Sequence, residues 1–189
     1  MTTIKLGDIA SQQNGTPYSD GFTLIELIIT LAIISILFHL TAPSFQDFGA
    51  NSRMTTQINT MVASFNYARS EAVKRNQNIV ICPNNEGSCA RQPHWHNGWL
   101  MFVDENFNRE IDRDEEIIFV EAEKQNIEII SSRYRRRVVF RELGTSAGSN
   151  GSYVFCDQRG ESEARAIILS NGGRTRIADK KSNGKDWPC

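Results

Sequence analysis

The longest apolar segment of the chain lies near the N-terminus, between residues 22 and 42. It reads FTLIELIITLAIISILFHLTA, and its only ionisable side chains are Glu26 and His39. A helix of that length is about 31 Å long, the thickness of the hydrocarbon core of a bilayer. The pattern predicts a membrane-spanning helix. The carboxylate of Glu26 would be costly there without a partner such as the N-terminal ammonium of a neighbouring chain.

A second helical pattern runs from residue 52 to residue 76. Apolar side chains recur there at spacings of three and four residues, as in an amphipathic helix that packs one face on a sheet. The predicted buried positions are Ile58, Met61, Val62, Phe65, Ala68, Ala72 and Val73.

Beyond residue 77 the pattern changes to short β-branched and aromatic runs separated by Gly, Asn and Asp. One long helix followed by many strands predicts an α+β fold with the helix packed on an antiparallel β-sheet. The predicted strands are residues 78–82, 99–103, 117–122, 127–131, 137–140, 153–156, 166–170 and 174–177.

Charge is unevenly distributed along this pattern, although the formal net charge of −1 excludes a wholly basic nucleic-acid coat protein. Residues 101–128 carry ten acidic and three basic side chains, whereas residues 131–189 carry twelve basic and six acidic ones. The C-terminal third is therefore a candidate anion-binding surface. The arginine run at 133–137 either lies on solvated surface or pairs with the acidic segment.

The sharpest basic feature follows the Asn-Gly-Gly sequence at 171–173, which predicts a turn between two short strands. Arg174 and Arg176 would then point the same way, about 6.6 Å apart, and Gly173 would permit close backbone approach. Two such guanidinium groups can bind successive backbone phosphates. We expect further mobile positive charge from Lys180, Lys181 and Lys185.

The residues at the start of the apolar segment carry a family resemblance. The sequence Gly21-Phe22-Thr23-Leu24-Ile25-Glu26-Leu27 resembles the processing site of type IV pilins and type II secretion pseudopilins. The resemblance implies that a prepilin peptidase cleaves after Gly21, that Phe22 is N-methylated, and that Glu26 neutralises a neighbour's N-terminus during assembly.

The same resemblance implies a domain organisation and a location. Residues 1–21 would be a removable leader, residues 22–50 a transmembrane and assembly segment, and residues 51–189 a periplasmic or extracellular pilin domain. The protein would be a single-pass inner-membrane protein before it joins a pilus at the cell surface, with other pilins or pseudopilins as partners.

Two further stretches narrow the resemblance. The sequence YARSEAVKR at 67–75, then Cys82, Gly98-Trp99 and Phe102-Val103-Asp104, resembles the GspH/FimT branch of minor pilins, which implies a type IV pilin-like fold. The sequence GRTR at 173–176 resembles the Gly-Arg-x-Arg motif of FimT-type minor pilins, which bind extracellular DNA for natural transformation. The alternative is a structural pseudopilin of type II secretion, or a pilus-priming minor pilin, that does not bind DNA.

The four cysteines all lie beyond residue 80, in the part that the resemblance places outside the cytoplasm, where disulfides persist. Sequence order suggests the pairs Cys82–Cys89 and Cys156–Cys189, with other pairings still open. A zinc site at Cys82, Cys89, His94 and His96 competes with the first pair, but its spacing differs from that of compact zinc modules.

An acidic loop offers a calcium alternative. An EF-hand-like pattern needs Gly at its sixth position, where this chain has Arg109, and the flanking segments predict strands rather than helices. A plain acidic hairpin loop explains the same residues. The residues at pattern positions 1, 3, 5, 7, 9 and 12 are Asp104, Asn106, Asn108, Glu110, Asp112 and Glu115.

No catalytic set is recognisable in the sequence. It contains no Gly-rich phosphate loop and no Ser or Cys nucleophile with a base at a known spacing. We therefore expect no enzymatic activity, no cofactor and no metal.

Overall fold

The computed structural model describes residues 21–124, 126–132 and 134–189, with the backbone alone at residues 39–44. The chain divides into two compact units, Met1–Phe45 and Gln46–Cys189. The predicted leader, apart from Gly21, lies outside the described residues.

The first unit contains the start of helix α1 (Leu24–Arg75). Thr23 caps the helix, because its hydroxyl oxygen accepts a hydrogen bond from the backbone N–H of Glu26 at 3.3 Å. The large apolar side chains from Leu24 to Phe38 are exposed in the single chain. Searched over the described residues alone, the structure contains no helix that is both long and apolar enough to cross a membrane.

The second unit begins with the rest of α1, which supplies one face of the core. The buried positions step along the helix by four and three residues, so they share one face. Val73 was predicted to be buried and is 55% exposed. Since Val73 comes one residue after Ala72, the last buried position, its side chain points about 100° away from that of Ala72 around the helix axis and lies outside the buried face. The buried apolar residues of this face are Met54, Ile58, Met61, Phe65, Ala68 and Ala72.

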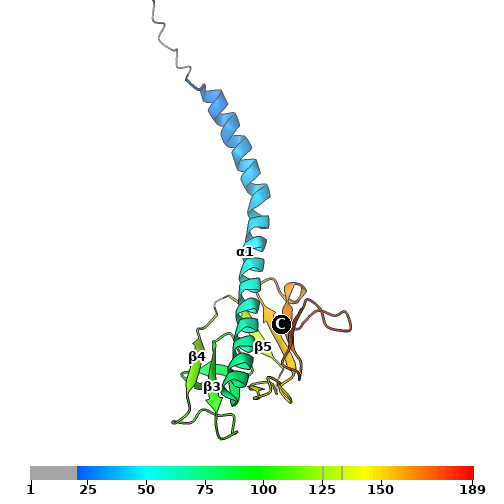
Figure 1. Cartoon of the computed structure of the whole chain (residues 1–189). Coiled ribbons are helices and arrows are strands. Elements are labelled where there is room, and N and C mark those ends of the chain that lie inside the picture. The colour runs from blue at the N-terminus through cyan, green and yellow to red at the C-terminus, as the bar shows by residue number, and fades with distance from the viewer. Residues whose placement is uncertain (1–20, 125, 133) are drawn as a thin grey trace, which may run out of the picture. The chain divides into compact units, whose positions relative to one another are not determined.

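The strands form two antiparallel sheets, and Figure 1 shows the C-terminal half of α1 with β3 and β4 on one side and β5 on the other. The first sheet has the order β2-β1-β3-β4, and β6 also pairs with β1. Its strands are β1 (Asn78–Asn85), β2 (Ser88–Cys89), β3 (Trp99–Asp104), β4 (Ile117–Glu121) and β6 (Val138–Phe140). The second sheet has the order β5-β7-β8-β9. Its strands are β5 (Glu128–Ser131), β7 (Gly151–Cys156), β8 (Arg165–Leu169) and β9 (Thr175–Ala178).

The predicted α+β fold is confirmed, and each predicted strand is present with bounds shifted by at most three residues. The pattern did not predict strand β2, the short 3-10 helix Glu161–Glu163 or the division into two sheets. One hydrophobic core joins α1 to both sheets. At its centre, the indole N–H of Trp99 on β3 donates to the hydroxyl of Ser64 on α1 at 3.0 Å.

The C-terminal end of α1 is attached to the acidic segment by an ion-pair network. The Arg75 guanidinium bonds Glu71 at 2.7 Å on its own helix and Glu116 at 2.6 Å before β4. Hydrogen bonds from Arg75 lower the pKa values of both carboxyl groups. Part of the negative charge of the acidic segment is therefore neutralised within the chain.

Both predicted disulfides are present. The Cys82–Cys89 bridge closes the β1–β2 hairpin, and the Cys156–Cys189 bridge ties the C-terminal residue to the end of β7. The tail is also held by Trp187, whose indole N–H donates to the carbonyl of Ala178 at 3.0 Å. Because Cys82 and Cys89 are bonded to each other, they offer no thiolates, and the zinc alternative that used them is wrong.

The two bridges differ in expected stabilisation because they close loops of different length, with sequence separations of 33 and 7 residues. Removing the longer bridge with Cys156→Ser/Cys189→Ser should lower the free energy of unfolding by about 3–4 kcal/mol, and Cys82→Ser/Cys89→Ser by about 2 kcal/mol. Urea denaturation of residues 46–189 measures both, and peptide mapping without reductant identifies the pairs. Free thiols in the oxidised protein would contradict the assignment.

Candidate nucleic-acid interface

The predicted turn and last strand form the β8–β9 hairpin. The backbone N–H of Gly173 donates to the carbonyl of Ser170 at 2.9 Å, and the N–H of Ser170 donates to the carbonyl of Arg174 at 3.0 Å. The hydroxyl of Ser170 also accepts from the N–H of Arg174 at 3.3 Å. Arg174 thus follows the turn directly, and Arg176 lies on β9 opposite Ile168.

Gly173 is buried beneath this turn, with a φ of +75°. A Cβ atom added there would lie 2.5 Å from the carbonyl oxygen of Gly144, closer than real Cβ contacts. The loop that carries Gly144 is fixed to the turn, because the hydroxyl of Ser146 donates to the carbonyl of Ser170 at 2.7 Å. The close approach that Gly173 allows is therefore to the protein's own backbone, and its predicted contact with a phosphate stays a prediction.

Replacing Gly173 by Ala should destabilise the second unit by about 2–3 kcal/mol, because it adds a left-handed backbone strain and a contact with Gly144. Gly148→Ala is the matched control. Gly148 has a φ of +79° and open space around its Cβ position, so the strain alone should cost about 1–2 kcal/mol. Chemical denaturation measures both values, and equal losses would contradict the packing role of Gly173.

The two arginines of the hairpin are exposed. Over the described residues, neither guanidinium has a hydrogen-bond or ion-pair partner. Arg176 lies on β9, and Arg174 directly precedes the first residue of that strand, with its carbonyl bonded to the N–H of Ser170. Side chains two positions apart in an extended chain project to the same side, as the sequence predicted for this pair. The guanidinium donors of Arg174 and Arg176 are therefore available to a ligand.

The three C-terminal lysines that the sequence predicts to carry mobile charge differ in their contacts. The ammonium of Lys180 pairs with Asp186 at 2.9 Å, and that of Lys181 lies 5.9 Å from the ring centroid of Trp187. Lys185 is exposed, and its side chain has no partner in the described part of the chain. Lys180 and Lys181 thus have partners within the chain, and the predicted role of all three lysines as mobile charge for DNA stays a prediction.

One basic residue beside the hairpin escaped sequence reasoning. A Cβ atom added at Gly173 would lie 3.6 Å from Cδ of Arg69, and one added at Gly144 would lie 3.2 Å from its Nε. The guanidinium of Arg69, on α1, therefore lies next to the turn that precedes Arg174. Since Arg69 and Gly173 are more than a hundred residues apart, no local pattern could have joined them.

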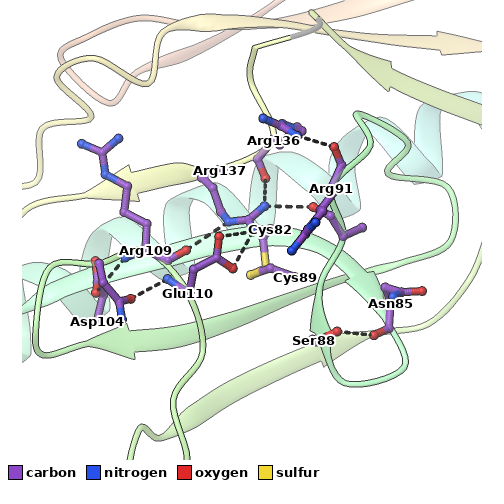
Figure 2. A network of polar contacts seen from close by, with 12 residues as sticks. Cys82, Asn85, Ser88, Cys89, Arg91, Asp104, Arg109, Glu110, Arg136 and Arg137 are labelled. Atoms are coloured by element: carbon purple, nitrogen blue, oxygen red, sulfur yellow. Dashed lines mark hydrogen bonds and ion pairs between the residues drawn. A yellow bond between two sulfur atoms is a disulfide. The ribbon is translucent and has the colours of Figure 1, made fainter.

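A second group of arginines surrounds a hollow of about 350 Å³. Figure 2 shows that two of these side chains, Arg136 and Arg137, are already bonded within the protein. Arg137 binds both carboxylate oxygens of Glu110 at 2.7 Å and donates to the carbonyl of Ala90 at 2.9 Å, and Arg136 donates to the carbonyl of Arg91. For the arginine run at 133–137, the alternative that it pairs with the acidic segment is thus confirmed at Arg137.

The acidic loop joins β3 to β4, as the pattern predicted. Asp104 is buried, and its Oδ1 accepts the backbone N–H of Arg109 at 3.2 Å, as the close view of this loop in Figure 2 also shows. Arg109 has a φ of 64° at the position where an EF-hand loop has Gly. The amide groups of Asn106 and Asn108 both donate to Asp112 at 2.7 Å. The calcium alternative stays a prediction.

Family comparisons agree with this architecture. Residues 57–173 match the family described as type II transport protein GspH, and residues 17–42 match the prokaryotic N-terminal methylation motif. The second match contains the predicted processing site at Gly21 and Phe22. The first contains most of the globular fold, up to the turn at Gly173.

Curated relatives share shorter segments. The pilin-like protein PilA1 of Thermus thermophilus is 33% identical over 102 residues, which cover 51% of this chain and 55% of that protein. The fimbrial protein EcpC of Eikenella corrodens is 51% identical over 39 residues, 21% of this chain and 26% of that one. The chain therefore spans about a quarter to about half of the length of these relatives.

A solved structure supports the fold. The crystal structure of the type IV minor pilin FimU of Pseudomonas aeruginosa superposes with a TM-score of 0.53, at 17% sequence identity, over 69% of this chain and 92% of that one. Three observations lead to one conclusion. The N-terminal helix packs on antiparallel strands, the methylation motif is present, and the family match covers more than half of the chain. The chain belongs to the GspH-type family of minor pilins and pseudopilins.

Proposed function

We propose that this protein is a minor type IV pilin that enters a pilus and binds extracellular DNA, without sequence preference, for uptake in natural transformation. The observation that carries the proposal is the exposed, unpaired state of Arg174 and Arg176 in the described structure, directly after a turn held by hydrogen bonds on both sides. A fixed backbone with free guanidinium groups suits phosphate binding, because the backbone loses little conformational entropy on contact and no existing bond of the guanidinium groups has to break.

The hairpin suits DNA better than the other arginine cluster does. Arg137 already uses its donors on Glu110 and on backbone carbonyls, so DNA would have to replace existing bonds there. Arg174, Arg176 and Lys185 have no such bonds in the described part of the chain, and Arg69 adds charge beside the turn. Phosphate contacts of this kind give affinity but carry no sequence information.

Assembly is proposed to follow the route that the N-terminal motif implies. A prepilin peptidase would cleave after Gly21, and Phe22 would become the methylated N-terminus. Residues 22–50 would anchor the chain in the inner membrane and then pack with other pilins. The exposed apolar side chains of residues 24–38 support this role, since a row of that kind needs lipid or a neighbouring helix to cover it.

The structural alternative places the basic surface against an acidic neighbouring subunit. Glu110 and Glu116 already form ion pairs with Arg137 and Arg75 of their own chain. The acidic segment of one copy is therefore only partly available to the basic surface of the next. This internal pairing favours a partner of another kind, such as DNA.

Fluorescence anisotropy with labelled duplexes of several unrelated sequences tests the proposal. We expect dissociation constants of about 10⁻⁴–10⁻⁶ M at physiological salt that are similar for all sequences and rise with salt. Absence of binding at low salt, or strong dependence on one sequence, would contradict non-specific phosphate binding by this surface.

A further inference from the structure

Two histidines lie on the outer side of a segment that runs along β5. The backbone N–H of Trp95 donates to the carbonyl of Ile129 at 2.8 Å, and the N–H of Ser131 donates to the carbonyl of Pro93 at 3.0 Å. These bonds place His94 opposite Ile130 in an antiparallel register. Trp95 is fully buried, so the alternation of an extended chain turns both of its neighbours outward.

The same register brings a carboxylate to the histidines. Two residues further along, His96 falls opposite Glu128, which precedes buried Ile129 on β5 and therefore faces outward. One ligand atom from each of His94, His96 and Glu128 lies within 4.8 Å of the others. Nδ1 of His94 is 4.0 Å from a carboxylate oxygen of Glu128, too far for a hydrogen bond.

The imidazole nitrogens lack the partners that buried polar atoms normally have. Nδ1 of His94 and Nδ1 of His96 are both shielded from solvent without a hydrogen bond to any described residue. The two rings lie edge to face with their centroids 5.4 Å apart. A shielded, unpaired nitrogen is costly, and for Nδ1 of His94, which lies beside the Glu128 carboxylate, a cation or a proton between the two would remove that cost.

We infer that His94, His96 and Glu128 form a site for a divalent transition metal ion, with Zn²⁺ as the reference ion. Two imidazoles and one carboxylate are one of the ligand sets that bind zinc with three protein ligands, which leaves a fourth position for water or another ligand. Imidazole also selects such ions over Ca²⁺ and Mg²⁺, which prefer oxygen ligands. The proposal is independent of DNA binding.

Metal binding requires the ligand atoms of the three side chains to move only slightly closer together. In a tetrahedral zinc site, bonds of 2.0–2.1 Å place ligand atoms about 3.3 Å apart. The side chains of His94 and Glu128 are 38% and 49% exposed, so rotation can bring their ligand atoms together. A bound ion would add a second connection, besides the backbone hydrogen bonds, between residues 93–96, which lie between β2 and β3 of the first sheet, and β5 at the edge of the second sheet.

The test uses the full chain in detergent micelles, without an affinity tag, and isothermal titration with zinc chloride. We expect one saturable Zn²⁺ per chain that excess Ca²⁺ does not displace. His94→Ala and His96→Ala should each weaken binding by about tenfold or more, and Glu128→Gln should weaken it less. The chain has three histidines, so His39→Ala is the matched control and should bind like wild type.

A spectroscopic measurement separates loss of ligands from loss of fold. Electron paramagnetic resonance of the Cu²⁺-loaded wild type should show coupling to two imidazole nitrogens, and each single histidine variant should show one. The inference is overturned if wild type binds no zinc, if His94→Ala and His96→Ala bind as wild type does, or if His39→Ala weakens binding equally.

Discussion

Replacing Glu26 by Ala should abolish incorporation of the protein into the filament while leaving its insertion into the inner membrane intact. Glu26 lies in the first turn of α1, two residues after the helix begins. In the proposed assembly its carboxylate meets the N-terminal ammonium of a neighbouring chain among lipid-exposed side chains. Removal of one charge would leave the other without a partner in an apolar environment, which is strongly unfavourable.

The measurement is the amount of the protein in sheared filaments relative to the membrane fraction, by immunoblotting, with a fall of at least about tenfold expected. Two variants serve as controls and should be incorporated like wild type. Ser35→Ala alters an exposed polar residue of the same helix whose hydroxyl donates to the carbonyl of Ala32. Glu142→Ala removes an exposed carboxylate from the globular unit. Normal incorporation of the Glu26 variant would refute its role in assembly.

Most of the fold could be predicted because it depends on local patterns. The stripe from Ile58 to Ala72 specifies a helix with one buried face, and each β-branched or aromatic run specifies a strand. The features that were not predicted are those that no local sequence pattern specifies. Strand β2 has two residues and exists because the Cys82–Cys89 hairpin aligns it with β1. The division into two sheets depends on pairings such as Ile79 with Phe140, which no short window contains.

In the candidate site, too, the features that a local pattern specifies could be predicted, and the contacts between distant residues could not. The turn at 171–173 fixes Arg174 and Arg176 locally, so their exposure on a hairpin could be predicted. The partners of other charges could not, because Arg69 and the turn, or Arg137 and Glu110, meet only in the folded chain. The grouping of His94 and His96 with Glu128 likewise needs the register of residues 93–96 along β5.

The double variant Arg174→Gln/Arg176→Gln should weaken DNA binding and reduce its dependence on salt. Glutamine keeps a hydrogen-bonding side chain but removes both charges. If each arginine contacts one phosphate, the slope of log affinity against log salt should become smaller by about two units. The fold should persist, because exposed side chains of this kind change stability by about 0.5 kcal/mol or less.

Anisotropy titrations at several salt concentrations measure this slope, with circular dichroism and thermal unfolding to verify the fold. Arg113→Gln is the matched control, since Arg113 is an exposed arginine in the acidic segment, away from the hairpin in sequence. It should leave the slope unchanged. A loss of slope in Arg113→Gln would indicate that total charge, not the hairpin, governs binding. If the double variant binds DNA as wild type does at every salt concentration, the DNA-binding proposal fails and the structural subunit without DNA binding takes its place.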